Sequence, residues 1–273
     1  MQEFIPTQRI KTIMKFLTLL CIHCSLFTIH HSASAAEGSQ GKHSSTPNVI
    51  VIMADDMGYG DVGCYGAKPE NLKTPHIDQL AAKGLRFTSG YCSASTCTPT
   101  RYAMLTGTHA FRVKGTGIAG PNSPALIKPD VVTMPDLLQK AGYKTAVIGK
   151  WHLSGIPADA NHPSSVGVDY FAGNLRGAIS DYAEWDLTIN GETSVSTQYH
   201  SSAITDLAID WIDDQTQPWF LWLAYVAPHS PFHLPPAGLH TQTLAGTEAD
   251  IAANPRAYYL AAIEAMDTEI GRL

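Results

Sequence analysis

Charged residues are scarce in this chain of 273 residues: they make up 15% of it, whereas hydrophobic residues make up 44%. That balance excludes a disordered chain, which needs many charges and few apolar side chains. The formal net charge of −6 gives no electrostatic support for binding nucleic acid. The sequence also lacks internal repeats and long low-complexity tracts, which excludes a repeat architecture. The length therefore suits one large α/β domain or two small ones.

No hydrophobic run is long enough for a comfortable membrane span. The mostly apolar stretch 16–29 follows three basic residues and precedes Ala33-Ser34-Ala35, which fits a small-residue cleavage site. This pattern predicts a signal peptide over residues 1–35, with a membrane anchor as the lesser alternative, and a flexible lead-in over residues 36–47. We therefore expect an exported protein, periplasmic or secreted, without a stable membrane span.

Cysteine is rare as well, with five in the chain. Removal of the predicted signal peptide would leave Cys64, Cys92 and Cys97. An odd number in an exported protein leaves one thiol free or modified. Cys64 and Cys92 could pair or stay reduced, and the sequence leaves both possibilities open.

The order of hydrophobic patterns predicts strands and helices in alternation over residues 48–273. Short apolar runs predict buried strands, and apolar residues at helical spacing, closed by glycines, predict helices. The expected strands are 48–53, 143–148 and 219–226, with 85–91 as a strand or an extended segment; the expected helices are 77–83, 99–105, 134–141, 200–212 and 258–273. This order predicts an α/β fold with a mostly parallel sheet and helices on both faces.

Polar side chains directly follow each of the three main expected strands. Asp55 and Asp56 follow the first strand, Lys150 and His152 the second, and His229 the third. Because ligands bind beyond the carboxyl ends of parallel strands, these side chains are candidates for one site. Two adjacent carboxylates suit a hard divalent cation, although an Asx turn or a helix cap is an equal alternative. Taken singly, the other residues are more often a solvated lysine and structural histidines.

A further candidate is the segment Cys97-Thr98-Pro99-Thr100-Arg101, at the expected start of a helix. Proline is compatible with the first helical turn, and the spacing puts Cys97 and Arg101 one turn apart on the same side. The unpaired first amides of a helix favour an anion. The segment therefore predicts an anion site where a nucleophile, a guanidinium and a helix N-terminus converge, with a buried, unreactive cysteine as the alternative.

This segment, with Leu105-Thr106-Gly107 downstream, resembles the Cys-x-Pro-x-Arg signature of the formylglycine-dependent, arylsulfatase-like sulfatases. Residues 55–66 (DDMGYGDVGCYG) and 149–153 (GKWHL) resemble two further motifs of that family. The resemblance implies an alkaline-phosphatase-like fold and the hydrolysis of a sulfate ester. It also implies that Cys97 is oxidised to formylglycine by a formylglycine-generating or an anaerobic sulfatase-maturing enzyme.

The same resemblance assigns roles to the carboxylates and cations. Calcium, with magnesium as the lesser alternative, would be held by Asp55, Asp56 and the oxygen of the residue made from Cys97. Lys150 would contact the sulfate group. Arg101 would hold the modified side chain and add positive charge.

The resemblance also implies an acid–base chemistry. The hydrated aldehyde has two hydroxyls: one attacks sulfur and expels the alcohol, and the other loses its proton as sulfate leaves. His152 would take that proton, and His229 would protonate the leaving-group oxygen. His233 lies close in the sequence and is an alternative to His229.

Two departures from the family pattern affect the interpretation. The first is that many relatives have arginine after Thr106-Gly107, where this chain has Thr108. The second is that the family has a further strand beyond a helix similar to 263–267, and this sequence ends before it. In the family, that later part supplies more metal ligands and a second lysine. We therefore interpret 48–273 as the N-terminal part of a sulfatase catalytic domain, truncated at its C-terminus. We expect residues 36–273 alone to release little or no sulfate.

A sulfated carbohydrate is the first expectation for the substrate, on family analogy alone. Two other functions stay open. One is a phosphoester or phosphonate hydrolase that uses the same modified cysteine, because phosphate and sulfate are both tetrahedral oxyanions. The other is a catalytically silent binding homologue with the same fold.

Overall fold

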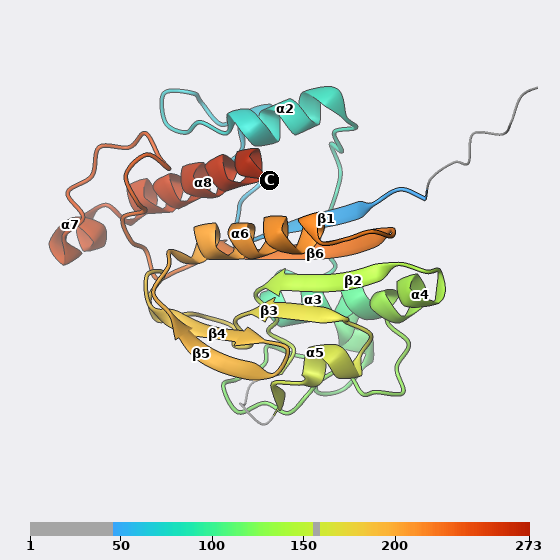
Figure 1. Ribbon diagram of the computed structural model, residues 1–273. Coiled ribbons are helices and arrows are strands. Elements are labelled where there is room, and N and C mark those ends of the chain that lie inside the picture. The colour runs from blue at the N-terminus through green and yellow to red at the C-terminus, as the bar shows by residue number, and fades with distance from the viewer. Residues whose placement is uncertain (1–45, 155–158) are drawn as a thin grey trace, which may run out of the picture. The chain divides into compact units, whose positions relative to one another are not determined.

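The computed structural model describes residues 46–154 and 159–273, so the predicted signal peptide and most of the predicted lead-in lie outside the described residues. Strands and helices follow one another along this part of the chain (Figure 1). The strands are β1 (Val49–Asp55), β2 (Lys144–Gly149), β3 (Tyr170–Gly173), β4 (Trp185–Ile189), β5 (Glu192–Ser196) and β6 (Trp219–Pro228). The helices are α2 (Pro75–Lys83), α3 (Cys97–Thr106), α4 (Met134–Lys140), α5 (His162–Ser165), α6 (His200–Asp213), α7 (Glu248–Ala253) and α8 (Pro255–Arg272), with short 3-10 helices at Gly63–Tyr65 and Ala110–Arg112.

One mixed sheet joins the strands in the order β1-β6-β2-β3-β4-β5. The first four of these are parallel to one another, whereas β4 and β5 pair antiparallel. Strand β6 lies inside the parallel part because its sequence is apolar almost throughout, and every residue after Trp219 is buried. The predicted mostly parallel sheet is therefore confirmed.

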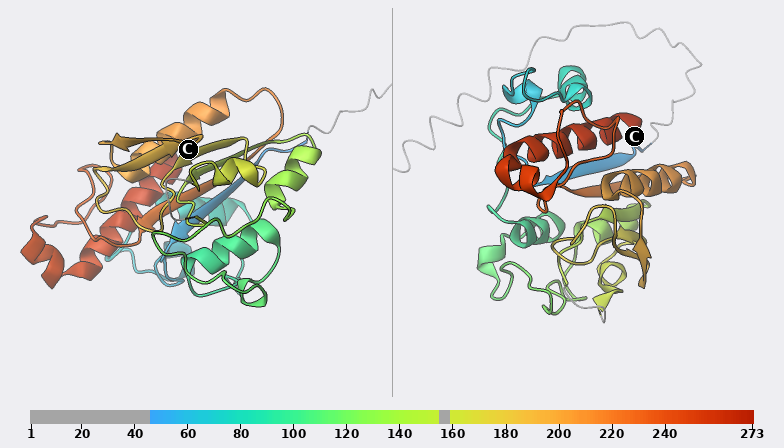
Figure 2. Two further views of the ribbon diagram at one scale, coloured as in Figure 1. Left: turned by 90° about the horizontal axis from the view of Figure 1, so that it is seen from below. Right: turned by 90° about the vertical axis from the view of Figure 1, so that its left-hand side faces the viewer.

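Helices cover both faces of the sheet, as predicted. Alternate residues of β6 point to opposite faces: Leu221, Leu223 and Tyr225 join a core with α6 and α8, whereas Phe220 and Trp222 join a second core with α3. Figure 2 shows α6 and α3 on opposite sides of the strands. Burial of apolar residues on both faces thus stabilises the parallel strands.

The ends of the helices follow local sequence signals. Helix α2 begins at Pro75, where a missing N–H costs no hydrogen bond. Helix α4 begins with a capping box, in which the side chains of Thr133 and Asp136 accept hydrogen bonds from each other's backbone amides. Helix α3 begins at Cys97 itself, two residues earlier than predicted. All the predicted helices are present, with ends that differ by a few residues.

Residues 85–91 form no strand, so the strand interpretation of this segment is wrong. The side chains of Leu85, Phe87 and Tyr91 are 80%, 66% and 92% exposed, and no neighbouring strand binds the segment's backbone. Alternation of apolar residues produces a strand only where a partner strand and a packed face are available.

Strands β3, β4 and β5 and the short helices α5 and α7 are absent from the predicted elements. The strands have four or five residues each, and β5 is polar, so their hydrophobic periodicity is weak. A signal for the β4–β5 hairpin is nevertheless present in the sequence. Asn190-Gly191 forms the two-residue turn between them, with positive φ values of 46° and 94° that favour these two residue types.

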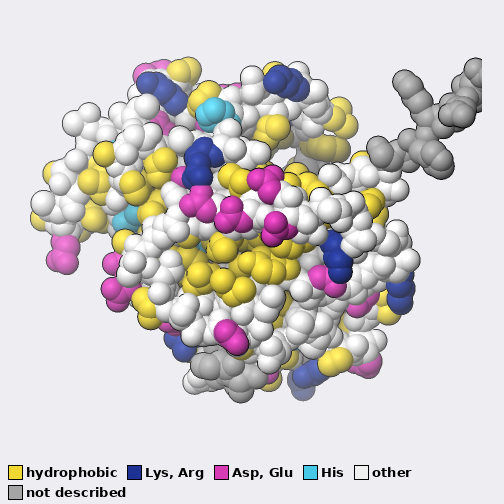
Figure 3. All heavy atoms as spheres, viewed as in Figure 1, with side chains coloured by type: hydrophobic (Ala, Val, Ile, Leu, Met, Phe, Trp, Pro, Cys, Tyr) yellow, Lys and Arg dark blue, Asp and Glu magenta, His cyan; other side chains and the backbone are white. Residues whose placement is uncertain are grey.

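The face seen in Figure 3 combines apolar and acidic side chains: apolar side chains gather below α6, and acidic ones lie along that helix. Partly buried apolar residues at the margin of the α6 core include Tyr170, Leu187 and Trp211. Among the residues that the structure describes, no helix has both the length and the apolar character needed to cross a bilayer.

Replacement of Leu223 by alanine should lower the free energy of unfolding by about 2–5 kcal/mol, because the side chain is fully buried in β6 and its loss leaves a cavity. Leu80→Ala on α2, where the leucine is 59% exposed, is the matched control and should cost less than about 1 kcal/mol. Urea unfolding followed by circular dichroism measures both losses. Equal losses in the two variants would contradict the core between β6, α6 and α8.

Candidate active site

The carboxyl ends of β1, β6 and β2 lie side by side and bring the predicted polar residues to one edge of the sheet. Asp55 lies opposite Pro228, the residue before His229. Lys150, the first residue after β2, donates its backbone N–H to the Ala224 carbonyl of β6 at 2.8 Å. The parallel register therefore gathers residues that are far apart in the sequence.

Two buried cations surround the Asp55 carboxylate. The Lys150 ammonium binds Asp55 Oδ2, and Arg101 Nη2 lies 3.4 Å from the same oxygen. Arg101 Nη1 also donates to the Lys150 carbonyl at 2.5 Å, and its guanidinium lies 5.6 Å from the centre of the Trp222 ring. Lys150 is 0% and Arg101 1% exposed. Two positive charges thus face one negative charge where little water reaches them, so the cluster attracts a further anion.

Burial lowers the pKa of both cations. Loss of water is the largest cause for Arg101 and for Lys150, and the nearby Asp55 and Cys97 act in the opposite direction. A bound anion would act in the same direction as Asp55 and favour the charged forms. Arg101 Nε is buried without a hydrogen-bond partner among the described residues, so one donor is available to such a ligand.

Cys97 is the first residue of α3, and Arg101 follows it one turn later in the same helix. The preceding residue, Thr96, has the N-cap position, but its side chain binds no amide of the helix. The first amides of α3 therefore have no side-chain cap and can face a ligand beside Cys97.

His152 is held by hydrogen bonds and a close packing contact at the end of β2. Its carbonyl accepts a hydrogen bond from Thr98 Oγ1 at 3.1 Å, and Nε2 donates to the Ala119 carbonyl at 2.9 Å. Its ring lies against Gly177, where an added Cβ would come within 2.1 Å of Nε2. Because Nε2 carries the hydrogen, Nδ1 has a free lone pair, and it is buried without a partner within the described part of the chain.

Burial lowers the pKa of His152 to about 4. Loss of water is the main cause, and the charges of Lys150 and Arg101 add to it. The ring is therefore neutral near pH 7, and its unpartnered Nδ1 can accept a proton.

Two candidate residues have a left-handed backbone: φ is 65° at Asp56 and 53° at His152. Such values are uncommon outside glycine, and they cluster at functional sites. The other non-glycine residue with positive φ in residues 46–154 and 159–273 is Asn190, in the hairpin turn. The chain thus bends sharply just after β1 and after β2, where the candidate side chains lie.

Asp56 and His229 form the exposed side of the site. His229 Nε2 lies 3.6 Å from Asp56 Oδ2, and the Asp56 side chain is 63% exposed. His229 Nδ1 donates to the Ser230 carbonyl at 2.7 Å, and the Tyr182 hydroxyl donates to the His229 carbonyl at 2.7 Å. Nε2 is therefore the nitrogen that His229 can direct toward a ligand.

His233, the alternative to His229, uses both ring nitrogens in structural contacts. Nδ1 donates to the Pro231 carbonyl at 3.0 Å, and Nε2 accepts from the Tyr199 hydroxyl at 3.0 Å. The ring also stacks on Tyr182, with 3.9 Å between the ring centres. This geometry favours His229 as the histidine of the site.

Asp55 and Asp56 have the hard oxygen donors that calcium or magnesium prefers. Within residues 46–154 and 159–273, no three His, Cys, Asp or Glu side chains gather in a group that could hold a metal ion. The two cations bound to Asp55 show that this position attracts positive charge. The residues fit part of a divalent-cation site, and the ligand set of Asp55, Asp56 and Cys97 stays a prediction.

Other residues of the first motif have structural contacts. Asp61 forms an ion pair with Arg256 and accepts a hydrogen bond from the Tyr259 hydroxyl at 2.8 Å. Cys64 and Cys92 do not pair with each other, and neither forms a disulfide within the described part of the chain.

Gly177 and Tyr182 support the site but are absent from the predicted residues. Both lie in the segment that joins β3 to β4 (174–184), here called the β3–β4 loop; one contacts His152 and the other His229. No sequence motif marks them, because their importance comes from contacts made only in the folded chain.

Residues 47–273 match the Sulfatase family. The N-acetylgalactosamine-6-O-sulfatase of Bacteroides thetaiotaomicron is 46% identical over 138 residues, which cover 48% of this chain and 27% of that protein. Human arylsulfatase A is 45% identical over 128 residues, which cover 46% of this chain and 25% of that protein.

A solved structure from work on the metabolism of multiple glycosaminoglycans by Bacteroides thetaiotaomicron has a TM-score of 0.68 and 26% identity. The match covers 84% of this chain and 58% of that one. The chain belongs to the sulfatase family and has its alkaline-phosphatase-like fold. It matches only part of the length of these relatives.

Acid should destabilise this fold, because burial lowers the pKa of His152 to about 4 and that of His200 to about 3. An unfolded chain binds protons at both residues near pH 6.5, whereas the folded chain does not, so the free energy of unfolding falls as the pH drops from about 6.5 toward 4. Urea unfolding at about pH 7, 6 and 5 measures the slope. His200→Gln should make the slope shallower, and an unchanged slope would contradict the buried neutral state of His200.

Gly177→Ala should displace the His152 ring, because the new Cβ would overlap it. The His152 Nε2–H signal in nitrogen-15 NMR should shift or disappear as the hydrogen bond to Ala119 is lost. Gly117→Ala is the matched control, since a Cβ there meets nothing within 4 Å. An unchanged His152 signal in the Gly177 variant would show that the loop does not hold the ring.

Proposed function

We propose that the protein containing this chain hydrolyses sulfate esters at the carboxyl ends of β1, β2 and β6. One observation carries this proposal: buried Lys150 and Arg101 outnumber Asp55, beside the helix N-terminus that begins at Cys97. Such an arrangement favours a tetrahedral oxyanion. Membership of the sulfatase family supports sulfate as that oxyanion.

Cys97 is the residue to be converted to formylglycine, by a formylglycine-generating or an anaerobic sulfatase-maturing enzyme that supplies the oxidation. Its place as first residue of α3, one turn before Arg101, supports this role. The hydrated aldehyde supplies one hydroxyl that attacks sulfur and a second whose proton is lost as sulfate leaves. Calcium, or magnesium as the lesser alternative, would be held by Asp55, Asp56 and the oxygen of residue 97, and would neutralise charge on the sulfate group.

The chain's own side chains bind the sulfate group and transfer the protons. Lys150 binds the sulfate oxygens and Arg101 binds the modified side chain, and their contacts with Asp55 hold both cations at the site. His152 is neutral with an open Nδ1, so it suits acceptance of the hydroxyl proton. His229 has Nε2 on the exposed side and suits donation to the leaving-group oxygen.

A sulfated carbohydrate is the proposed substrate class. The support is the name of one relative, an N-acetylgalactosamine-6-O-sulfatase, and the similarity to a structure from glycosaminoglycan metabolism. Export to the periplasm or the medium is also a proposal, based on the signal-peptide pattern of residues 1–35.

The alternatives are less well supported. The named relatives are sulfatases, which does not favour a phosphoester or phosphonate hydrolase. A silent binding homologue would have no need for the buried excess of positive charge around Asp55, or for a neutral histidine with an unpartnered nitrogen beside it.

Cys97→Ala in the complete, matured protein should reduce hydrolysis of an aryl sulfate by about a thousandfold or more, because the attacking group is lost. Cys92→Ala is the control, since that exposed thiol has no disulfide partner among the described residues. Conversion of a cysteine thiol to an aldehyde lowers the mass of the peptide that contains it. Tandem mass spectrometry of the tryptic peptide 87–101 from the unsubstituted protein should place this loss of mass at position 97, not 92.

An aryl phosphate assayed in parallel measures the competing activity. Retained sulfate release in Cys97→Ala would overturn the proposed function. A higher kcat/KM for the phosphate than for the sulfate would favour the alternative hydrolase.

A further inference from the structure

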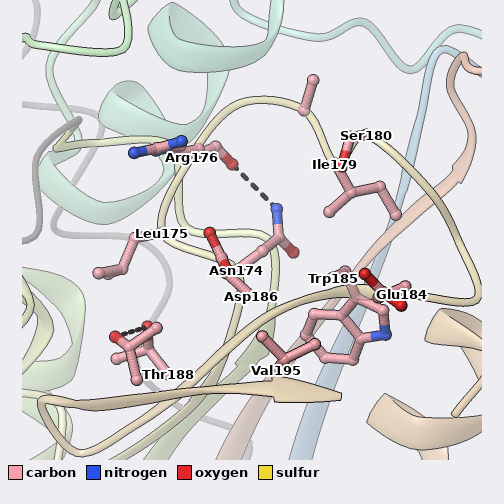
Figure 4. Close-up of a pocket in the computed structure, with 12 residues that line it drawn as sticks. Asn174, Leu175, Arg176, Ile179, Ser180, Glu184, Trp185, Asp186, Thr188 and Val195 are labelled. Atoms are coloured by element: carbon pink, nitrogen blue, oxygen red, sulfur yellow. Dashed lines mark hydrogen bonds between the residues drawn. The ribbon is translucent and has the colours of Figure 1, made fainter. Parts of the chain in front are cut away.

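A cavity of about 680 Å³ lies between the β3–β4 loop and the β4–β5 hairpin, here called the hairpin pocket. Figure 4 shows Ile179, Trp185 and Val195 on one side of it, with Leu175 and Arg176 on another. Its volume is in the range of pockets that enclose small organic ligands. None of the site residues derived above lines it.

The hairpin supplies a floor of alternating residues. Asp186 and Thr188 of β4 pair with Val195 and Thr193 of β5, and all four line the pocket. The hydroxyls of Thr188 and Thr193 bind each other at 2.8 Å, as the dashed line in Figure 4 marks. One face of a short antiparallel pair thus presents a carboxylate, two hydroxyls and an apolar side chain to the cavity.

Three charged residues of the lining have no side-chain partner among the described residues. Glu184, Asp186 and Arg176 are exposed, and within the described residues their side chains form no ion pair or hydrogen bond. Two carboxylates against one guanidinium disfavour a strongly anionic occupant. Carboxylates accept hydrogen bonds from hydroxyl groups, and Ile179 and Val195 can pack against C–H groups. The lining therefore suits an uncharged ligand rich in hydroxyls.

The β3–β4 loop is a wall shared by the hairpin pocket and the proposed active site. Gly177 lies against His152, whereas its neighbours Arg176 and Ala178 line the pocket. Further along the loop, Tyr182 binds the His229 carbonyl. The pocket and His152 therefore contact the same three-residue segment of this loop, which places the pocket next to the proposed active site.

We propose that the hairpin pocket binds an uncharged sugar unit next to the sulfated one in a sulfated glycan. Glu184 and Asp186 accept hydrogen bonds from its hydroxyls, and the apolar residues contact its ring. This inference rests on the proposed sulfatase function and specifies which part of the substrate the protein selects beyond the sulfate group.

The test compares two substrates of the complete, matured protein. One is a disaccharide in which an uncharged hexose is linked to 6-O-sulfo-N-acetylgalactosamine; the other is an aryl sulfate, which has no second sugar. In the double variant Glu184→Gln, Asp186→Asn, the ratio of kcat/KM for the disaccharide to kcat/KM for the aryl sulfate should fall about tenfold, as expected when hydrogen bonds to charged groups are lost.

Glu192→Gln is the matched control. Glu192 is an exposed carboxylate of the same hairpin. It does not line the pocket, whereas the next residue, Thr193, does. The control should keep the wild-type ratio. An unchanged ratio in the double variant, or an equal fall in the control, would overturn the proposal.

Failure of the proposed function gives a different result, because the wild type would then release sulfate from neither substrate. In that case calorimetry with the same disaccharide tests the pocket directly. Binding to the wild type that is at least about tenfold weaker in the double variant would support the pocket. Absence of binding, or equal binding in both proteins, would overturn it.

Discussion

The buried contact of Asp55 with Lys150 and Arg101 is the interaction on which the site depends. Each partner comes from a different element: β1, the end of β2, and α3. Removal of the carboxylate would leave two buried cations without a counter-charge, which typically costs about 3–5 kcal/mol. Asp55 therefore both holds these elements together and keeps two cations ready for an anion.

A second constraint is the support of the two histidines by one loop. The β3–β4 loop contacts His152 through Gly177 and His229 through Tyr182, and the stack of Tyr182 on His233 anchors its far end. The loop thus couples the position of the proposed proton acceptor, His152, to that of the proposed proton donor, His229. Its other side lines the hairpin pocket, so the substrate selection and the proton transfer that we propose would share one structural element.

Much of the fold could be predicted because local patterns determine it. The apolar run of β6 and the helical periodicity of α6 and α8 are visible without tertiary information. The segment 85–91 has a strand-like pattern but no partner strand, and β3 and β4 are too short to show a pattern. The Asn190-Gly191 turn was the available signal for the hairpin.

The sequence by itself determined the candidate chemistry: carboxylates, a cysteine, cations and histidines at strand ends and at a helix start, because residue type and local order are written in the chain. Only the tertiary structure decided which of them meet. In the folded chain, Lys150 and Arg101 contact one oxygen of Asp55. Both ring nitrogens of His233 form hydrogen bonds, whereas Nδ1 of His152 has no partner among the described residues. The physical reason is that charge pairing and burial depend on distances between elements, which the register of the parallel strands sets and local sequence does not encode.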